Sequence, residues 1–358
     1  MRDIATVVFA LAAVCLPGGG AETAGWSPRL AAQYLDERLK LWLDFTATQP
    51  KQHLACVSCH TSLPYLLARP ALRMALAEPA PASYEDRLLA TVRARVQGWR
   101  SSPPYYPRKF AQSRGAEAIL YALLLARDDA QTGRRALSEG TEAAFANLWA
   151  EQIPDGEHRG AFEWLDFGLH PWETPGARYF GAALAAVAAG TAPGGYASRP
   201  AIQDRLSALR AYLMTDPGPL TAHDRLMLLW ASAKLPALLS SADRLAAVRR
   251  LTGAQNADGG WKTESLGPWQ LRPGITLPSE SEAYATAFLA FALRQSGVDA
   301  AKEPLARALS WLRKRQDPRS GAWISSSMNK TYAPDHIAAG FMTDAATAYA
   351  ALALASNP

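Results

Sequence analysis

Two kinds of helical segment alternate along the chain, and this alternation limits the possible fold more than any other feature. One kind is apolar almost all round and rich in small residues, as in "ARYFGAALAAVAAG" (177–190) and "DAATAYAALALA" (344–355). Such helices must be buried on most sides. The other kind is amphipathic, as in "PLARALSWLRKRQ" (304–316). Strand-type alternation is nearly absent, so we predict an all-α fold.

The apolar and amphipathic segments form pairs that repeat along the chain. Helices are predicted near 28–47, 62–77, 83–98, 113–128, 132–151, 176–190, 199–213, 220–233, 240–255, 279–296, 301–315 and 341–355. The first turns of the apolar helices align at Glu117, Arg178, Asp224, Glu282 and Asp344, in steps of 61, 46, 58 and 62 residues. A period near 60 residues predicts an (α/α)₆ toroid with the apolar helices inside. An open solenoid would show a more regular period and polar caps.

The ends of the amphipathic helices carry a glutamine–glycine–tryptophan pattern. Gln316 is followed by Gly321 and Trp323, and Gln255 by Gly259 and Trp261. A weaker copy places Phe where the others have Trp, with Leu148, Gln152, Gly160 and Phe162. An amide can satisfy helix-terminal backbone groups, and a tryptophan buries a large area while its N–H finds a partner.

These segments resemble the QW repeats of the squalene–hopene and oxidosqualene cyclase family, whose toroid is shared with protein prenyltransferase β-subunits. The resemblance implies a toroid over residues 80–358, in which the glutamine caps the outer helix and the tryptophan stacks on it. It does not extend to the chemistry, because the chain lacks the family's D-x-D-D proton-donating motif. We therefore expect no typical class II cyclase activity.

The N-terminal segment has the form of a secretory signal. Arg2 precedes the apolar run 4–16, and "PGGGA" then breaks the helix. We predict a signal peptide at 1–21, a haem-bearing helical segment at 22–80 and the toroid at 81–358. The processed chain is expected to be exported to the periplasm without a membrane span; a lipid anchor at Cys15 is the lesser alternative, because Val14 fits a lipobox poorly.

A C-x-x-C-H motif lies in "HLACVSCHTSLPYLLARP" (53–70). This spacing is the attachment signature of haem c, in which two thioethers hold the porphyrin and the histidine binds its iron. The motif predicts one covalent haem on Cys56 and Cys59 with His60 as the proximal ligand. A redox dithiol or a disulfide between Cys56 and Cys59, a zinc site and a chance match are the alternatives, but a thioredoxin-like dithiol lacks its βαβ context and a zinc site lacks further cysteines.

The remaining haem contacts are left open by the sequence. Arg69 and Arg73, one helical turn apart, could pair with the propionates or form a solvated helix face. The candidates for the distal iron ligand are the mouth-loop residues His170, Met328, His336 and Met342, and a five-coordinate iron is the alternative.

Acidic residues at the first turns of the inner helices would surround one mouth of the toroid. Asp166, Glu282 and Asp344 are the candidate catalytic residues, although acids also favour any helix N-terminus. The loops 159–180 and 325–344 are rich in aromatic and unusual residues and should lie at the same mouth. They could line a ligand site or plug the ring.

Together these patterns predict an exported c-type haem protein that transfers electrons or senses redox state. The alternative is a haem- or acid-dependent enzyme that acts on an apolar, isoprenoid-like substrate in the toroid. A redox protein or an apolar small molecule is the expected partner. Nucleic acid is not, because the 37 lysines and arginines are scattered and the net charge is only +5.

Overall fold

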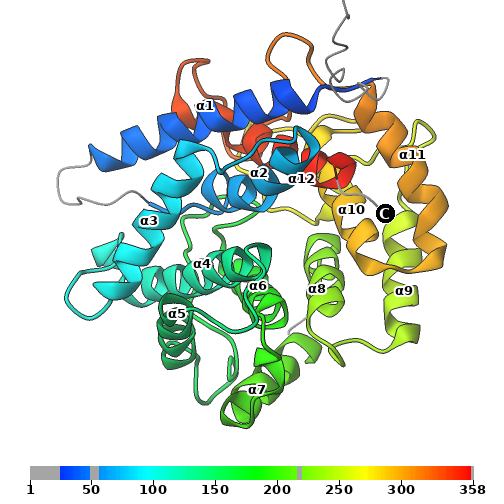
Figure 1. The fold of residues 1–358 in the computed structure, drawn as a ribbon. Coiled ribbons are helices and arrows are strands. Elements are labelled where there is room, and N and C mark those ends of the chain that lie inside the picture. Colours follow the sequence, from blue (N-terminus) through cyan, green and yellow to red (C-terminus); the bar gives the residue numbers. More distant parts are fainter. Residues whose placement is uncertain (1–24, 49–55, 216–219, 356–358) are drawn as a thin grey trace, which may run out of the picture.

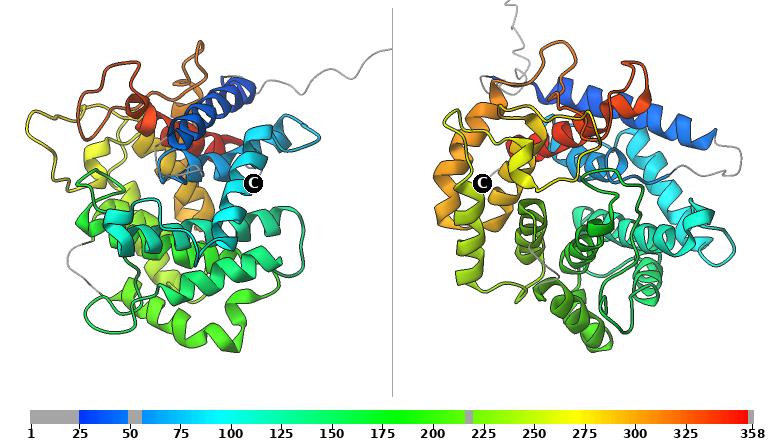
Figure 2. Two further views of the ribbon diagram at one scale, coloured as in Figure 1. Left: turned by 90° about the vertical axis from the view of Figure 1, so that its left-hand side faces the viewer. Right: turned by 180° about the vertical axis from the view of Figure 1, so that it is seen from behind.

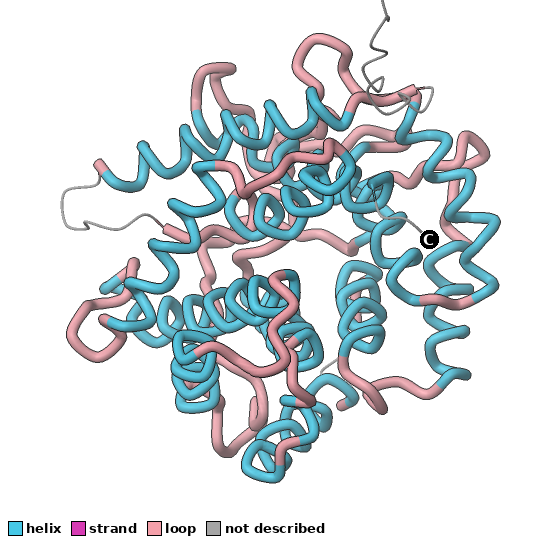
Figure 3. The backbone as a smooth tube through the Cα atoms, viewed as in Figure 1, coloured by secondary structure: helices cyan, strands magenta, loops and turns pink. Residues whose placement is uncertain are grey.

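A computed structural model describes residues 25–48, 56–215 and 220–355. These residues form twelve α-helices and no strand, which confirms the all-α prediction (Figure 3). The helices are α1 Pro28–Ala47, α2 Ser62–Ala75, α3 Ser83–Gln97, α4 Phe110–Gln131, α5 Glu139–Ala150, α6 Arg178–Thr191, α7 Gln203–Met214, α8 Ala222–Lys234, α9 Ser241–Thr252, α10 Ala283–Ser296, α11 Lys302–Arg313 and α12 Phe341–Ala355. Short 3₁₀ turns lie at Pro107–Lys109, Pro175–Ala177, Tyr196–Ser198, Pro200–Ile202, Thr263–Leu266, Asp299–Ala301 and Ile337–Gly340.

The even-numbered helices form an inner ring. Each packs on the next, from α4 through α6, α8 and α10 to α12, and α2 closes the ring between α12 and α4. Their small side chains allow this close approach; in α12, for example, every residue from Met342 to Ala353 is buried. Figure 1 shows this ring surrounded by the odd-numbered helices. The predicted α/α toroid is therefore confirmed.

The odd-numbered helices form an outer layer with one wet face each. In α11 only Ala308, Leu309, Trp311 and Leu312 are buried, and they lie one helical turn apart on the face toward the ring. The first pair, α1 and α2, occupies its own place in the same layers, with α1 packed on α2 and α12. The ring thus includes residues on both sides of the boundary predicted at residue 80.

The glutamine and tryptophan of the repeat have roles that differ from the expectation. Trp323 Nε1 donates to the carbonyl of Leu312 at 2.8 Å, and Trp261 Nε1 donates to the carbonyl of Leu251 at 3.0 Å. The tryptophan therefore caps the C-terminal end of its own outer helix. The orphan groups at that end are carbonyls, which need a donor, and the indole N–H supplies one.

The glutamines instead join one outer helix to the next. Gln255 Nε2 donates to the carbonyl of Pro304 at the start of α11. Gln316 Nε2 donates at 3.0 Å to the carbonyl of Ser27, the N-cap of α1, and Gln316 Oε1 accepts from the Ser27 amide at 2.6 Å. This last pair of bonds joins the end of the outer layer to its beginning.

Helix ends differ from the predicted ones where local capping decides. The helix predicted from residue 132 begins at Glu139, because Ser138 accepts from the Thr141 amide and its own amide donates to Asp129 at 2.7 Å. The segment before it, 132–137, is held outside the helix by this turn. Asp129 is itself buried and also pairs with Arg134.

The described residues contain one segment, Ile337–Ala355, that is long and apolar enough to cross a membrane by length and composition alone. It includes α12, whose side chains are mostly buried in the ring, as expected of a core helix. The predicted signal peptide at 1–21 lies outside the described residues, so the predicted export stays a prediction.

Candidate functional site

The loops that precede the inner helices meet on one face of the ring, here called the mouth (Figure 2). Asn329 ties two of them together: its Oδ1 accepts from the His170 amide at 2.8 Å, and its Nδ2 donates to the His170 carbonyl at 2.7 Å. Arg272 joins a third loop to the same segment, donating to the carbonyls of Phe167 and Gly168 at 3.4 and 3.3 Å. The predicted mouth loops are thus brought together as one surface.

The C-x-x-C-H segment lies at this mouth, directly before α2. Cys56, Cys59 and His60 are all buried, with exposed fractions of 8%, 2% and 7%. Burial raises the pKa of both thiols well above the usual range, and the carboxylate of Glu173 raises each further. Both thiols are therefore protonated and weak nucleophiles at neutral pH. Trp42 Nε1 donates to the Cys56 carbonyl at 2.7 Å and fixes the backbone there.

The imidazole of His60 is oriented by a chain of hydrogen bonds. Its Nδ1 lies 2.8 Å from Thr61 Oγ1, and the Thr61 hydroxyl donates to Asp344 at 2.7 Å. Because the hydroxyl proton is used on Asp344, Nδ1 must carry the hydrogen and donate, which leaves Nε2 with a free lone pair. Burial lowers the pKa of His60 to about 3, so the ring is neutral. Phe341 stacks on it with ring centroids 3.6 Å apart.

Asp344, a predicted catalytic candidate, is engaged at both oxygens. Oδ1 accepts from Tyr34 at 2.9 Å and Arg38 Nε at 2.7 Å, and Oδ2 accepts from Thr61 and from Arg38 Nη2 at 3.0 Å. It is 1% exposed. A carboxylate with four donors has no lone pair readily available for a substrate, so it holds the mouth together.

Glu282 differs from the other aligned acids. Glu117 accepts from Arg95 and three further donors, and Asp224 forms a capping box with Thr221. Glu282 is 7% exposed, and among the described residues its carboxylate accepts one hydrogen bond, from the Ser326 amide to Oε1 at 3.1 Å. Its Oε2 is buried and has no hydrogen-bond partner among the described residues.

Glu173 is the acid that sequence reasoning did not select. Its backbone is held in a tight turn: the amide donates to the Leu169 carbonyl at 2.8 Å, and the Glu173 carbonyl accepts from the amides of Phe167 and Leu169. Its carboxylate forms no salt bridge within the described part of the chain. Burial raises its pKa to about 7. The signal available was its place between Trp172 and Thr174 in a loop before an inner helix.

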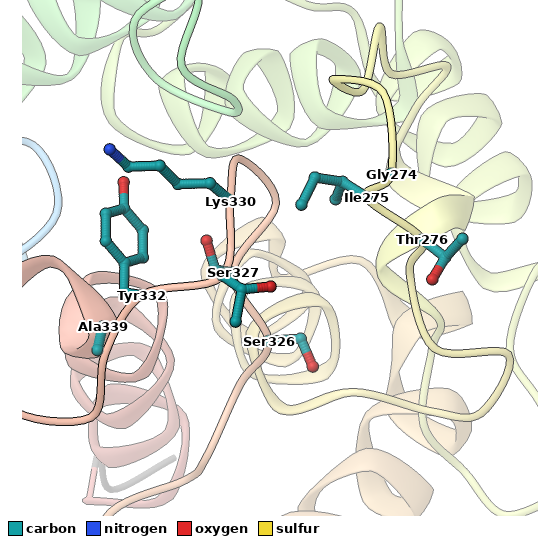
Figure 4. Close-up of a pocket in the computed structure, with 9 residues that line it drawn as sticks. Gly274, Ile275, Thr276, Ser326, Ser327, Lys330, Tyr332 and Ala339 are labelled. Atoms are coloured by element: carbon teal, nitrogen blue, oxygen red, sulfur yellow. The ribbon is translucent and has the colours of Figure 1, made fainter.

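A cavity of about 380 Å³ opens between the loops 274–276 and 326–332 (Figure 4). Its lining is mostly hydroxyl-bearing, and Lys330 is its charged residue. The lining residues are Gly274, Ile275, Thr276, Ser326, Ser327, Lys330, Thr331, Tyr332 and Ala339. Burial raises the pKa of Tyr332, the charge of Arg272 lowers it, and the charge of Glu173 raises it again. Both charged groups therefore act on the Tyr332 hydroxyl from outside the lining of the cavity.

The two arginines predicted to bind haem propionates have protein partners. Arg69 donates to Asp36 and Glu78, and Arg73 forms two bonds of 2.6 and 2.7 Å with Glu85. Propionate binding by these arginines stays a prediction.

The other predicted residues are distributed around the mouth. His170 Nε2 bonds to the Gln270 carbonyl, and His336 Nδ1 accepts from the Ala338 amide. Met328 and Met342 are buried, and Asp166 accepts from the Gly168 amide within its own loop. These residues have separate partners and do not form one cluster.

No family model and no curated protein matches the chain. Among solved structures, it is similar to an unsaturated glucuronyl hydrolase responsible for the degradation of glycosaminoglycan, from Bacillus sp. GL1. The identity is 11%, the TM-score is 0.54, and the match covers 91% of this chain and 96% of that one. A UGL variant with dGlcA-Glc-Rha-Glc gives 13% identity and a TM-score of 0.53, over 90% and 94%. A possible GH105 family member from Salmonella enterica gives 16% and 0.30, over 93% and 82%.

These findings correct the function predicted from the sequence. The structural match to the unsaturated glucuronyl hydrolase covers about nine-tenths of this chain. A separate haem-bearing segment added to the toroid is therefore not shown. The predicted electron-transfer or redox-sensing cytochrome is wrong, and so is the alternative enzyme acting on an isoprenoid-like substrate. The general metal-binding class is also wrong, because the described residues hold no group of three or more His, Cys, Asp or Glu able to bind a metal ion.

Some narrower predictions are not tested by these findings. One covalent haem c on Cys56, Cys59 and His60 stays a prediction, as do the partners and the absence of nucleic-acid binding. The finer resemblance to the squalene–hopene cyclases also stays a prediction beside the confirmed α/α toroid.

Proposed function

We propose that this chain is a hydrolase of oligosaccharides that carry a uronic acid residue, and that Glu173 is its proton donor. The observation that carries the proposal is the position of Glu173, a carboxyl group without an ion-pair partner in the described structure, at the mouth of the ring. Two structures that share this ring belong to an unsaturated glucuronyl hydrolase and to a UGL variant with an oligosaccharide.

The chemistry of such a reaction requires an acid. Hydrolysis of a glycosidic bond needs a proton on the leaving oxygen, and opening of an unsaturated uronide needs a proton on its enol ether. A carboxyl group serves at neutral pH only when its environment keeps part of the population protonated. Burial does this for Glu173, whose pKa of about 7 leaves roughly half of the molecules protonated at that pH.

The surroundings of Glu173 suit a sugar. Trp172 precedes it, and the Trp172 and Tyr284 rings meet edge to face with centroids 5.6 Å apart. The charge of Glu173 also acts on Tyr332, whose side chain lines the hydroxyl-rich cavity. Aromatic faces and hydroxyl groups are what a ring with one apolar face and several O–H groups needs.

Glu282 is the second acid of the site. Its carboxylate accepts a hydrogen bond from the amide of Ser326, a residue that lines the cavity, so Glu282 lies next to the cavity. Its unpartnered Oε2 is positioned to accept a hydrogen bond when the mouth loops adjust around a substrate. A carboxylate left this way is costly unless a ligand or water completes it.

The test uses the purified full chain with a disaccharide that ends in an unsaturated uronic acid. Cleavage is followed by loss of the ultraviolet absorbance of the conjugated double bond and by the new reducing end. We expect turnover by the wild-type chain and a loss of about 100-fold or more for Glu173→Gln. Glu157→Gln, at an exposed loop residue, is the matched control and should retain full activity.

A saturated uronide and a neutral glucoside, each with a chromogenic leaving group, complete the panel. The neutral glucoside should be the poorest substrate. The proposal is overturned if the wild-type chain cleaves none of the uronides, or if Glu173→Gln keeps wild-type activity while circular dichroism shows that it is folded.

A further inference from the structure

Lys330 is an ammonium group without a carboxylate partner in the described part of the chain. It forms none of the salt bridges there, and its Nζ lies over the Tyr332 ring, 5.0 Å from the ring centroid. Arg272, near the same tyrosine, donates to two backbone carbonyls rather than to an acid. Many other cations of this protein, such as Arg73 and Arg95, are paired with acids.

The cavity that Lys330 lines contains no acidic residue. Its other polar groups are the hydroxyls of Thr276, Ser326, Ser327, Thr331 and Tyr332, which can both donate and accept. In Figure 4 the polar ends of Lys330 and Tyr332 lie close together on one side of this space. A cation surrounded by hydroxyl groups is suited to a ligand that carries one negative charge among several O–H groups.

The backbone that presents Lys330 is held in place. Asn329, its neighbour, forms the two hydrogen bonds with His170 that join the mouth loops, and its amide donates to Ser327 Oγ at 3.3 Å. A charged group on an anchored segment loses less freedom when a ligand binds. The loop that carries Lys330 is thus already in place before a ligand binds.

From these observations we infer that this cavity is the subsite for the carboxylate of the uronic acid residue, with Lys330 as the residue that selects an acidic sugar over a neutral one. The inference rests on the proposed function. Lys330 Nζ lies over the Tyr332 ring, and the charge of Glu173 acts on the same tyrosine, so a sugar held by its carboxylate at Lys330 is expected to extend toward the proton donor.

The experiment measures binding separately from turnover. Glu173→Gln, which should bind without cleaving, is titrated calorimetrically with glucuronate, with its methyl ester and with glucose. Addition of Lys330→Met should weaken glucuronate binding about tenfold or more and leave the two neutral sugars unchanged. Lys330→Arg should restore part of the difference. Lys314→Met, at an exposed lysine at the end of α11, is the matched control and should bind like its parent.

The kinetic counterpart compares the unsaturated uronide with its methyl ester in a chain that keeps Glu173. Lys330→Met should raise KM for the acid and leave kcat and the ester nearly unchanged. Equal losses for acid and ester, or no loss for either, overturn the inference while the wild-type chain still cleaves uronides. A wild-type chain that binds glucuronate through Lys330 but cleaves nothing overturns the proposed function alone. If glucuronate does not bind at all, the subsite is overturned.

Discussion

The hydroxyl of Thr61 donates a 2.7 Å hydrogen bond to Asp344 across 283 positions of sequence. Thr61 immediately precedes α2 and Asp344 lies in the first turn of α12, so the bond spans the junction where the ring closes. The same carboxylate is held by Arg38 and Tyr34 of α1. One buried acid thus joins the first helix pair to the last, and through Thr61 it also fixes the tautomer of His60.

Replacement of Asp344 should therefore destabilise the whole ring. Asp344→Ala leaves the Arg38 guanidinium without its bidentate partner, and breaking a buried ion pair costs about 3–5 kcal/mol. Denaturant unfolding followed by circular dichroism measures the loss. Asp299→Ala removes a fully exposed pair with Lys302 and should cause no measurable change. Equal stability of the two variants would contradict the structural role given to Asp344.

The glutamine that closes the outer layer offers a second test. Gln316→Ala removes two hydrogen bonds to Ser27 and one to the Gly321 carbonyl, with an expected loss of about 1–3 kcal/mol. Amide exchange should rise at the start of α1. Gln255→Ala removes the equivalent bonds to the carbonyls of Gly259 and of Pro304 in α11, and it should leave α1 protected. Gln33→Ala, on the exposed face of α1, is the surface control.

Gly321 is expected to tolerate no side chain. Its φ is +77°, and a Cβ there would lie 2.4 Å from the backbone carbon of Leu30. Gly321→Ala should therefore lower the free energy of unfolding by about 2–4 kcal/mol, through backbone strain and overpacking. Gly140→Ala is the control: it lies in α5 with open space around it, and should raise stability by up to about 1 kcal/mol. Thermal unfolding of both variants decides the matter.

The pH dependence of cleavage should follow Glu173. Its carboxyl must be protonated to donate, and burial raises its pKa to about 7, so kcat/KM should be high below pH 7 and fall above it. The same shift means that the folded chain retains a proton that the unfolded chain releases, so stability from this group is lost as pH rises through about 7. A rate that increases through pH 7 would exclude Glu173 as the donor. Glu173→Gln should remove the contribution of this group to the pH dependence of the free energy of unfolding.

The fold could be predicted because its determinants are local. Apolar runs of small residues, such as 177–190, have no stable place except inside other helices, and amphipathic runs such as 304–316 need one covered face. The repeated glutamine and tryptophan marked the outer-helix ends, but it is the tryptophan that caps the helix end, and the glutamine joins one outer helix to the next. The assignment of each group depends on which orphan backbone atoms lie nearest, which spacing alone does not give.

The site could be predicted only in part, because its contacts join distant segments. Glu282 and Asp344 look alike in the sequence, yet Asp344 meets Arg38 while Glu282 keeps a buried oxygen unpartnered in the described structure. The sequence placed Glu173 in an aromatic loop before an inner helix but could not single it out, since its raised pKa depends on burial in the folded chain. The C-x-x-C-H motif lies at the mouth, beside the other predicted site residues, but the electron-transfer function predicted from it is wrong.

Because Gln316 bonds to Ser27, the outer layer closes where its last helix, α11, meets its first helix, α1. Neighbouring pairs elsewhere in the circle meet through the same type of glutamine bridge, as Gln255 and Pro304 show. The order in which the pairs are synthesised is therefore separable from the order in which they touch. A circularly permuted chain, with its new ends in a loop on the face opposite the mouth, would be expected to form the same ring of helix pairs.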